Sequence, residues 1–168
     1  MRLVYPNEKY LESYTQAYNE YRDNNITTYG LKDPNTEDFF ERHYNYRMGI
    51  NLPEGRVPQT TYWLVENGEF IGEISIRHDL TDFLLKYGGN IGYGVRMTKW
   101  RQGYGTKMLK MGLKKAKAMG LSRVLITCNI DNYGSMGVIE NNGGVLENIV
   151  KNNIDGRTFQ TRRYWINL

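Results

Sequence analysis

The sequence predicts one domain of the α/β (α+β) class, with a mixed, mostly antiparallel sheet and helices on both faces. Two segments of helical periodicity come first, and from Thr61 onward β-branched and aromatic runs alternate with turn residues. A single strand–helix–strand unit interrupts the hairpins, and the two strands of such a crossover run parallel. The 168 residues suffice for one domain with its own core and are few for two, so residues 1–168 are interpreted as a single domain.

Residues 6–22 predict a first helix, because apolar and aromatic side chains recur there at spacings of three and four. These side chains are Tyr10, Leu11, Tyr14, Ala17, Tyr18 and Tyr21. Residues 35–47 predict a second helix. The chain has 14 tyrosines, many of them in this N-terminal third, and we interpret the tyrosine stripe as core rather than as a platform for stacking bases.

Residues 61–78 predict a β-hairpin, because Asn67 and Gly68 between two strand-like runs are a strong turn signal. The same patterns predict the remaining elements. They are a turn or loop at 79–90, a strand at 91–96, a helix from about 103 to 119, a buried strand at 123–129, a short helix within 132–144, and a closing hairpin of 145–150 and 158–168 around a turn at 152–156.

Composition narrows the possible environments and partners. Cys128 is the only cysteine, so no intrachain disulfide can form, and a reducing cytoplasm is expected. No apolar run approaches the ~20 residues of a membrane span, and the first residues lack the features of a signal peptide. Two histidines without ligand spacing argue against a metal site. The net charge of +4 leaves open a solvated lysine surface, a nucleic-acid binder or a pocket for an anionic ligand.

The start of the helix at 103–119 is predicted to bind an anion. A glycine in a helix costs up to ~1 kcal/mol relative to alanine, yet Gly103 and Gly105 both stand at this helix start. Unpaired amide groups and the positive end of the helix dipole meet there, and missing side chains would let a phosphate approach them. Close packing of helix on sheet is the alternative reason for the glycines. A P-loop is excluded, because Thr106 rather than lysine follows Gly105.

Two runs carry a resemblance to a known family: "IGYGVRMTKWRQGYGTKML" and, after it, "LITCNIDNYGSMGVIENNGGVLE". Together they resemble the GCN5-related N-acetyltransferases (GNAT), in element order as well as in motif. The flanking hairpins also match that topology, so the likeness spans most of the chain. The resemblance implies a GNAT-like sheet and the transfer of an acetyl group from acetyl-CoA to a primary amine of a small molecule or protein, by direct attack in a ternary complex.

The resemblance also implies a set of cofactor-binding residues. Backbone groups of Val95, Arg96 and Met97 would meet the pantetheine arm. The pyrophosphate would be held by the turn of Arg101, Gln102, Gly103, Tyr104, Gly105 and Thr106. Asn132 and Ser135 would line the path of the cofactor. Two positions depart from the family pattern: Trp100 stands at the first Arg/Gln position of the motif, and Ile139 stands where many relatives carry a tyrosine that protonates the leaving thiolate.

Glu73 is the candidate general base, because isoleucines on both sides suggest a partly desolvated carboxylate with a raised pKa. An outward-facing strand glutamate is the alternative, and His78 is a second candidate base. Tyr133 is the candidate acid, and a packing role is its alternative. Cys128 is interpreted as a buried, inert thiol rather than a nucleophile.

The leading hypothesis is therefore an acetyl-CoA-dependent N-acetyltransferase that uses no metal. A non-catalytic acyl-CoA-binding or regulatory module on the same fold stays open, whereas the lysine face is only the solvent side of a helix and gives little support to a nucleic-acid binder. The expected partner is an amine acceptor, without nucleic acid or membrane, and a homodimer is left open. The acceptor pocket is expected between the N-terminal helices, residues 79–90 and the last hairpin, where aromatic side chains favour an apolar or cationic acceptor.

Overall fold

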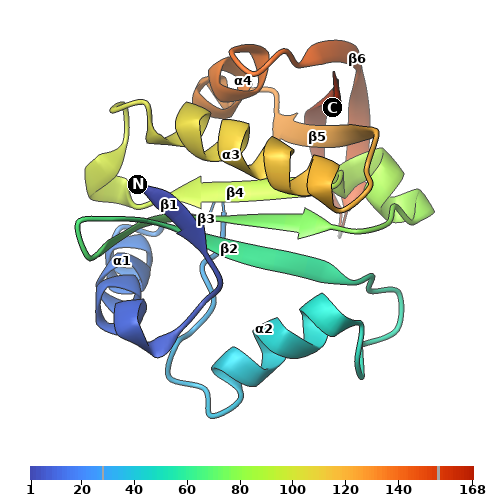
Figure 1. Cartoon of the computed structure of the whole chain (residues 1–168). Coiled ribbons are helices and arrows are strands. Elements are labelled where there is room, and N and C mark those ends of the chain that lie inside the picture. Colours follow the sequence, from blue (N-terminus) through green and yellow to red (C-terminus); the bar gives the residue numbers. More distant parts are fainter. Residues whose placement is uncertain (28, 155) are drawn as a thin grey trace.

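The computed structural model describes residues 1–27, 29–154 and 156–168, and in it seven strands form one sheet with helices on both faces (Figure 1). The strand order is β1-β2-β3-β4-β5-β7-β6, and every neighbouring pair is antiparallel except β4 and β5. The strands are β1 Arg2–Val4, β2 Gln59–Glu66, β3 Glu69–Arg77, β4 Ile91–Val95, β5 Arg123–Asn129, β6 Val145–Ile154 and β7 Arg157–Asn167. The α-helices are α1 Leu11–Asp23, α2 Phe39–Met48, α3 Tyr104–Ala118 and α4 Tyr133–Glu140. The predicted fold class is confirmed.

The α-helices α1 and α2 begin at Leu11 and Phe39, later than the predicted starts at residues 6 and 35, and three further details differ from the sequence prediction. Strand β1 was not predicted, because three residues are too few to show an alternating pattern; it pairs with β2, Leu3 opposite Leu64. Residues 79–90 contain a short π-helical turn, η2 Leu84–Gly88, instead of only a loop. Strand β6 runs to Ile154, so residues 152–154 of the predicted turn belong to the strand, and Asp155 of the same turn lies outside the described residues.

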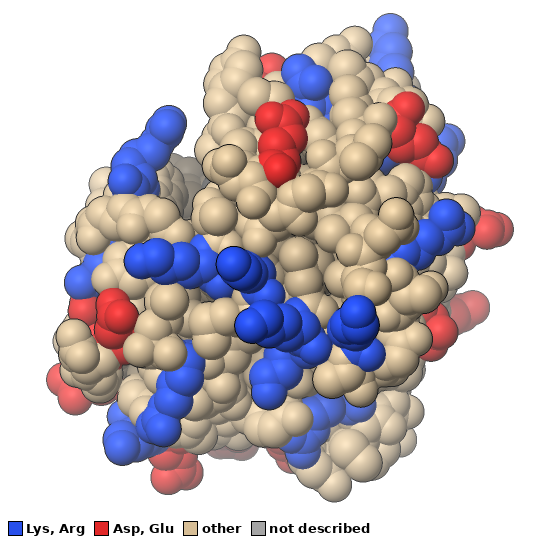
Figure 2. Space-filling model, turned by 45° about the horizontal axis from the view of Figure 1, so that its top comes forward, with Lys and Arg blue, Asp and Glu red and all other residues tan. Residues whose placement is uncertain are grey.

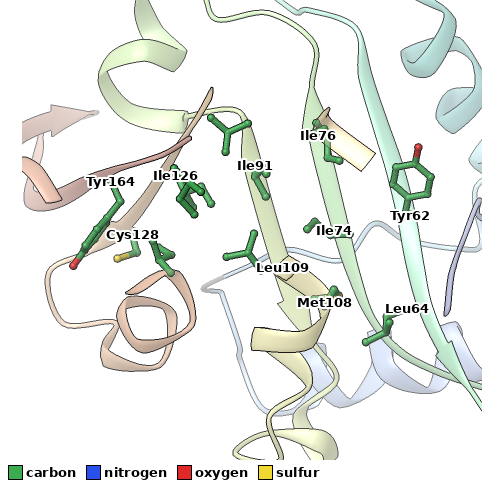
Figure 3. Close-up of a cluster of buried hydrophobic side chains, with 14 of the residues drawn as sticks. Tyr62, Leu64, Ile74, Ile76, Ile91, Met108, Leu109, Ile126, Cys128 and Tyr164 are labelled. Atoms are coloured by element: carbon green, nitrogen blue, oxygen red, sulfur yellow. The ribbon is translucent and has the colours of Figure 1, made fainter. Parts of the chain in front are cut away.

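Helices α3 and α4 cover one face of the sheet, and α1 and α2 cover the other (Figure 1). On the α3 face, Met108 and Leu109 pack against Ile74, Ile91 and other strand residues in a buried cluster (Figure 3). The buried residues of α3 are Met108, Leu109, Gly112 and Ala116, and its five lysines are exposed, which confirms that the lysine face is the solvent side of this helix. The crossover therefore holds the start of α3 at the end of β4.

The tyrosine stripe of α1 forms the core on the other face, as predicted. Tyr14 is fully buried and stacks on Trp63 of β2 with ring centroids 4.5 Å apart. Phe70 of β3 and Phe39 of α2 pack on the same pair of rings. Aromatic packing thus ties both N-terminal helices to the sheet next to β3.

Strands β4 and β5 touch at one end and separate at the other. Their only paired residues are Ile91 and Ile126. Just before Ile91, the amide of Asn90 donates to the Leu125 carbonyl at 2.7 Å, and its side-chain oxygen accepts from the Leu125 amide at 2.8 Å. Beyond this point no ladder bonds join β4 to β5 within the described residues, so the sheet opens between them. β4 meanwhile stays in register with β3 along its whole length.

Candidate functional site

A cavity of about 270 Å³ lies at the opening between β4 and β5. Gly92 and Tyr93 of β4 and Thr127 of β5 line it, and residues of α4 and β7 complete the wall. The hydroxyls of Tyr93 and Ser135 are joined across it by a 2.8 Å hydrogen bond. The opening is therefore a polar slot with free strand edges on two sides.

The edge of β4 presents backbone amides to this slot. The Arg96 amide donates to the Ile71 carbonyl of β3 at 2.8 Å. Because ladder bonds alternate along an antiparallel pair, the amides of Tyr93 and Val95 point the other way, toward β5. Of the predicted pantetheine-binding residues, Val95 thus directs its amide toward the side of β5, beyond the residues that line the slot. The Arg96 amide is engaged by β3, and Met97 begins the 3-10 turn η3 Met97–Lys99.

The turn from β4 into α3 carries unpaired amides. Lys107 donates to the Gly103 carbonyl at 3.2 Å, whereas the amides of residues 102–106 have no partner within the described part of the chain. Gly103 is the N-cap residue with φ of +79°, and Arg101 also has a positive φ, +60°. This run of free donors at the positive end of a helix is a site that favours a phosphate group.

Gly103 and Gly105 are required in this turn for different structural reasons. A Cβ at Gly103 would meet no atom within 4 Å, so its left-handed backbone and open surroundings explain this glycine. A Cβ at Gly105 would lie 3.0 Å from Val138 and 3.7 Å from Val95. Gly105 therefore serves the close packing of α3 against β4 and α4, which was the alternative reading of both glycines.

Two of the basic residues near this turn are neutralised. Arg96 is 8% exposed and pairs with Glu20 at 2.6 Å and Glu69 at 3.0 Å, which anchors the end of β4 to α1. Lys99 pairs with the same Glu69 at 2.8 Å. Arg101 is exposed and makes no ion pair among the described residues. Figure 2 shows a band of Lys and Arg side chains across the neighbouring surface.

Glu73 of β3 is buried on the opposite side of the sheet, with 4% of its surface exposed. Its carboxylate accepts hydrogen bonds from the Tyr29 hydroxyl at 2.8 Å and from Trp63 Nε1 at 2.9 Å. Burial raises the pKa of Glu73 above its ordinary value, and the two hydrogen bonds oppose this. The desolvated carboxylate predicted from the flanking isoleucines is confirmed, and the outward-facing alternative is wrong.

Tyr29 is the site residue that the sequence did not reveal. It lines the slot between β4 and β5, and also a second cavity of about 620 Å³ bounded by α2, β2 and β3, in which Glu73 lies. Its ring rests on the backbone of Gly94, where a Cβ would come within 2.5 Å of the ring. Only the fold brings Tyr29 to Glu73, so no local pattern could have indicated it.

Of the other predicted residues, some line the slot and others do not. Asn132 lines it and caps α4, accepting from the Ser135 amide at 3.0 Å. Tyr133 is 67% exposed and borders neither cavity in the described structure. His78 is paired with Thr60 at 2.8 Å at the far end of β3. Ile139 lies on the inner side of α4 and is fully buried in the core.

Cys128 is buried against Tyr164, with its side chain in the core (Figure 3) and part of its surface on the slot. Burial raises the pKa of its thiol, so the inert interpretation suits its surroundings. Within residues 1–27, 29–154 and 156–168, no cluster of His, Cys, Asp and Glu could hold a metal ion. None of the helices described has both the length and the apolar character that a bilayer crossing needs.

Comparison with known proteins identifies the family of this chain. The domain family described as "Acetyltransferase (GNAT) domain" matches residues 2–145. This chain is a GNAT-family acetyltransferase. The resemblance read from the sequence is thereby confirmed. A comparison of this sequence with curated proteins found no match.

Solved structures of GNAT acetyltransferases share its fold. The microcin C7 self-immunity acetyltransferase MccE, solved with acetyl-CoA and AMP, is 21% identical, with a TM-score of 0.72 over 99% of this chain and 91% of MccE. RimL, an alpha-N-protein acetyltransferase of ribosomal L7/L12 solved with coenzyme A, is 18% identical, with a TM-score of 0.70 over 99% and 93%. A mutant of the spermidine N-acetyltransferase SpeG from Vibrio cholerae is 15% identical, with a TM-score of 0.66 over 99% and 95%. At these identities the likenesses establish the fold of the acetyltransferase alone.

Proposed function

We propose that this acetyltransferase moves the acetyl group of acetyl-CoA to a primary amine by direct attack within a ternary complex. One observation carries the proposal: β4 separates from β5 after a single pair and is followed by a helix start whose amides have no partner within the described residues. A long ligand with an anionic group at one end and amides along its arm suits both features. That MccE and RimL were solved with acetyl-CoA and coenzyme A supports this choice.

Each part of acetyl-CoA would have a matching part of the site. The pyrophosphate would accept hydrogen bonds from the amides of residues 102–106, with Arg101 beside it. The pantetheine arm would pair with the free edge of β4 at Tyr93 and Val95 and pass Asn132 and Ser135 on the other wall. The acetyl group would then lie in the slot, facing Tyr29.

The transfer forms a bond from the amine nitrogen to the acetyl carbon and breaks the bond from that carbon to sulfur. An amide of the β4 edge would polarise the thioester carbonyl. Glu73 is the proposed base, because its raised pKa lies closer to the working pH. The proton of the amine would reach Glu73 through a water molecule or through the hydroxyl of Tyr29, which is hydrogen-bonded to the carboxylate. The leaving thiolate takes up one proton.

The proton that the leaving thiolate takes up needs a donor close to the slot. Tyr133 is the predicted donor, but it is exposed at the outer side of α4. The hydroxyls of Tyr93 and Ser135 border the slot itself, and burial raises the pKa of Tyr93, so it keeps its proton at neutral pH. We therefore propose this hydroxyl pair as the donor, with Tyr133 as the alternative.

Release of free CoA thiol from acetyl-CoA in the presence of a panel of amines tests the function, with mass spectrometry of the products. We expect a mass gain of one acetyl group on an amine and no gain on the matching alcohol. Tyr93→Phe should slow the release more than Tyr133→Phe if the slot hydroxyls donate the proton. The reverse order would return that role to Tyr133.

A non-catalytic acyl-CoA-binding module is the second candidate, because Ile139 is buried and offers no acid at the position where many relatives carry a tyrosine. Tight acetyl-CoA binding without thiol release for any amine would establish it. Binding of a DNA or RNA duplex that weakens steeply with salt would instead point to a nucleic-acid partner. A cytoplasmic location and a homodimer stay predictions from the sequence.

A further inference from the structure

The 620 Å³ cavity has no ligand assigned to it by the cofactor site described above. It lies between α2 and strands β2 and β3, and Glu73 and Tyr29 form the end that adjoins the slot. A cavity of this volume suits a small molecule rather than a folded protein surface. If the proposed function holds, this is the side from which the amine acceptor reaches the acetyl group.

The charges around this cavity are unequal. Four cationic side chains line it, against two carboxylates. The cations are Lys32, Arg42, Arg56 and Arg77, and the carboxylates are Asp38 and Glu73. His43 adds no positive charge at neutral pH, because burial lowers its pKa to about 4.

Both carboxylates are already occupied by protein groups. Asp38 pairs with Arg42 at 3.4 Å, and Glu73 accepts from Tyr29 and Trp63. Among the described residues, Lys32 and Arg56 pair with no carboxylate. The exposed rim thus carries unneutralised positive charge while the deep end carries the proposed base.

Arg77 extends this positive charge to the junction of the two cavities. It lines both of them and donates to the backbone carbonyls of Gly88 at 3.2 Å and Gly89 at 3.0 Å. Those neutral carbonyls fix the guanidinium without cancelling its charge. Guanidinium groups bind carboxylate and phosphate in a planar, two-pronged geometry.

We propose that the acceptor is a small primary amine that also carries a carboxylate or phosphate, which the side chains of Arg56, Lys32 and Arg77 recognise. The proposal rests on the proposed function, since it names the substrate class of the same site. It reverses the cationic acceptor expected from the aromatic residues of the sequence. A polyamine would place two or more positive charges against this rim and would be repelled.

Matched pairs of amines test the class with saturating acetyl-CoA. The pairs are 4-aminobutanoate with 4-aminobutanamide and 2-aminoethyl phosphate with ethanolamine, and spermidine is tested alone. We expect kcat/KM for CoA release at least about tenfold higher for the acidic member of a pair, and whichever pair shows it separates carboxylate from phosphate recognition. Equal rates within both pairs, or a preference for spermidine, would overturn the proposal.

Charge reversal at the rim assigns the effect to this cavity. Arg56→Glu should reduce the preference for the acidic member to near unity, and Arg56→Lys should keep most of it. Lys117→Glu, an exposed change of the same charge on α3, is the control that should keep the preference. A preference that survives Arg56→Glu and Lys32→Glu together would place acid recognition elsewhere.

Binding separates this inference from the proposed function. If no amine is acetylated, calorimetric titration of the same amines into the protein saturated with CoA is decisive. Binding of the acidic members that is lost in Arg56→Glu would keep the inference and end the proposed function. Absence of binding for every acidic member would overturn the inference as well.

Discussion

The Tyr29 hydroxyl donates a 2.8 Å hydrogen bond to Glu73, 44 positions further along the chain, while the Tyr29 ring lies on the bare backbone of Gly94. Tyr29 therefore links the segment between α1 and α2 to strand β3 through Glu73 and to strand β4 through Gly94. It fixes a buried carboxylate at the boundary between the two cavities, where the chemistry of an amine acceptor would need it.

Glu73→Gln should reduce transfer by about a hundredfold while leaving acetyl-CoA binding unchanged, since a positioned base typically contributes 10²–10⁴-fold. Initial rates of CoA release and calorimetric affinity for acetyl-CoA measure the two quantities. Glu12→Gln on the exposed side of α1 is the control. A rate within twofold of wild type in Glu73→Gln would remove Glu73 from the mechanism.

The same substitution predicts how stability depends on pH. Glu73 has a raised pKa in the folded protein, so the folded state holds this proton more tightly than the unfolded chain. Its contribution is fully present below the ordinary value of about 4.3 and is lost as the pH rises through the higher pKa of the folded state. The free energy of unfolding of wild type minus that of Glu73→Gln should therefore fall from pH 4 to pH 7, as urea titrations can measure. A rise over that window would contradict the burial of this carboxylate.

Tyr29→Phe should move the acidic limb of the pH–rate profile upward. The hydroxyl stabilises the ionised form of Glu73, so its loss raises the pKa of the carboxylate further. A hydrogen bond to a charged group is worth about 1.5–3 kcal/mol, so the upward movement of the acidic limb should be readily measured. The ring of phenylalanine still covers Gly94, so the fold should be kept. An unchanged profile would show that Glu73 titrates independently of Tyr29.

Gly94→Ala should displace Tyr29 and lower both stability and transfer, because the new Cβ would stand 2.5 Å from the ring. Overpacking of this kind costs about 1–3 kcal/mol. At Gly92, two residues earlier on the same strand, the nearest atom would be 3.4 Å away. The thermal midpoint should therefore fall clearly more for Gly94→Ala than for Gly92→Ala, and equal midpoints would mean that the ring is not packed as described.

Gly103→Glu should weaken acetyl-CoA binding at least about tenfold, which corresponds to ~1.4 kcal/mol. The added carboxylate meets open space in the protein but faces the amides proposed for the pyrophosphate. Gly103→Gln has the same size and the same backbone strain without the charge, so the difference between the two isolates electrostatics. Equal affinities for these variants would place the diphosphate away from this turn. Gly105 suits this test less well than Gly103, because a side chain there would collide with Val138.

Local patterns determined most of the fold. The spacing of Tyr14, Ala17 and Tyr21 indicated the buried side of α1, and Asn67 and Gly68 indicated the β2–β3 turn. The lysines of α3 indicated its solvent side. These features could be predicted because each depends on neighbours within a few positions. Strand β1 and the π-helical turn η2 could not, since three residues show no period and the backbone of η2 is fixed by its contacts with β5 and β7.

The sequence by itself determined that this chain is a GNAT-like domain, where its α3 turn stands, and that Glu73 is set among isoleucines. Tertiary structure alone decided that Tyr29 reaches Glu73 and that the basic residues of four separate segments border one cavity. It also decided that Arg96 is neutralised by ion pairs with Glu20 and Glu69. The reason is physical. The periodicity of a helix or strand depends on residues that are close in sequence. Desolvation and charge balance depend on groups that meet only when the sheet brings distant segments together.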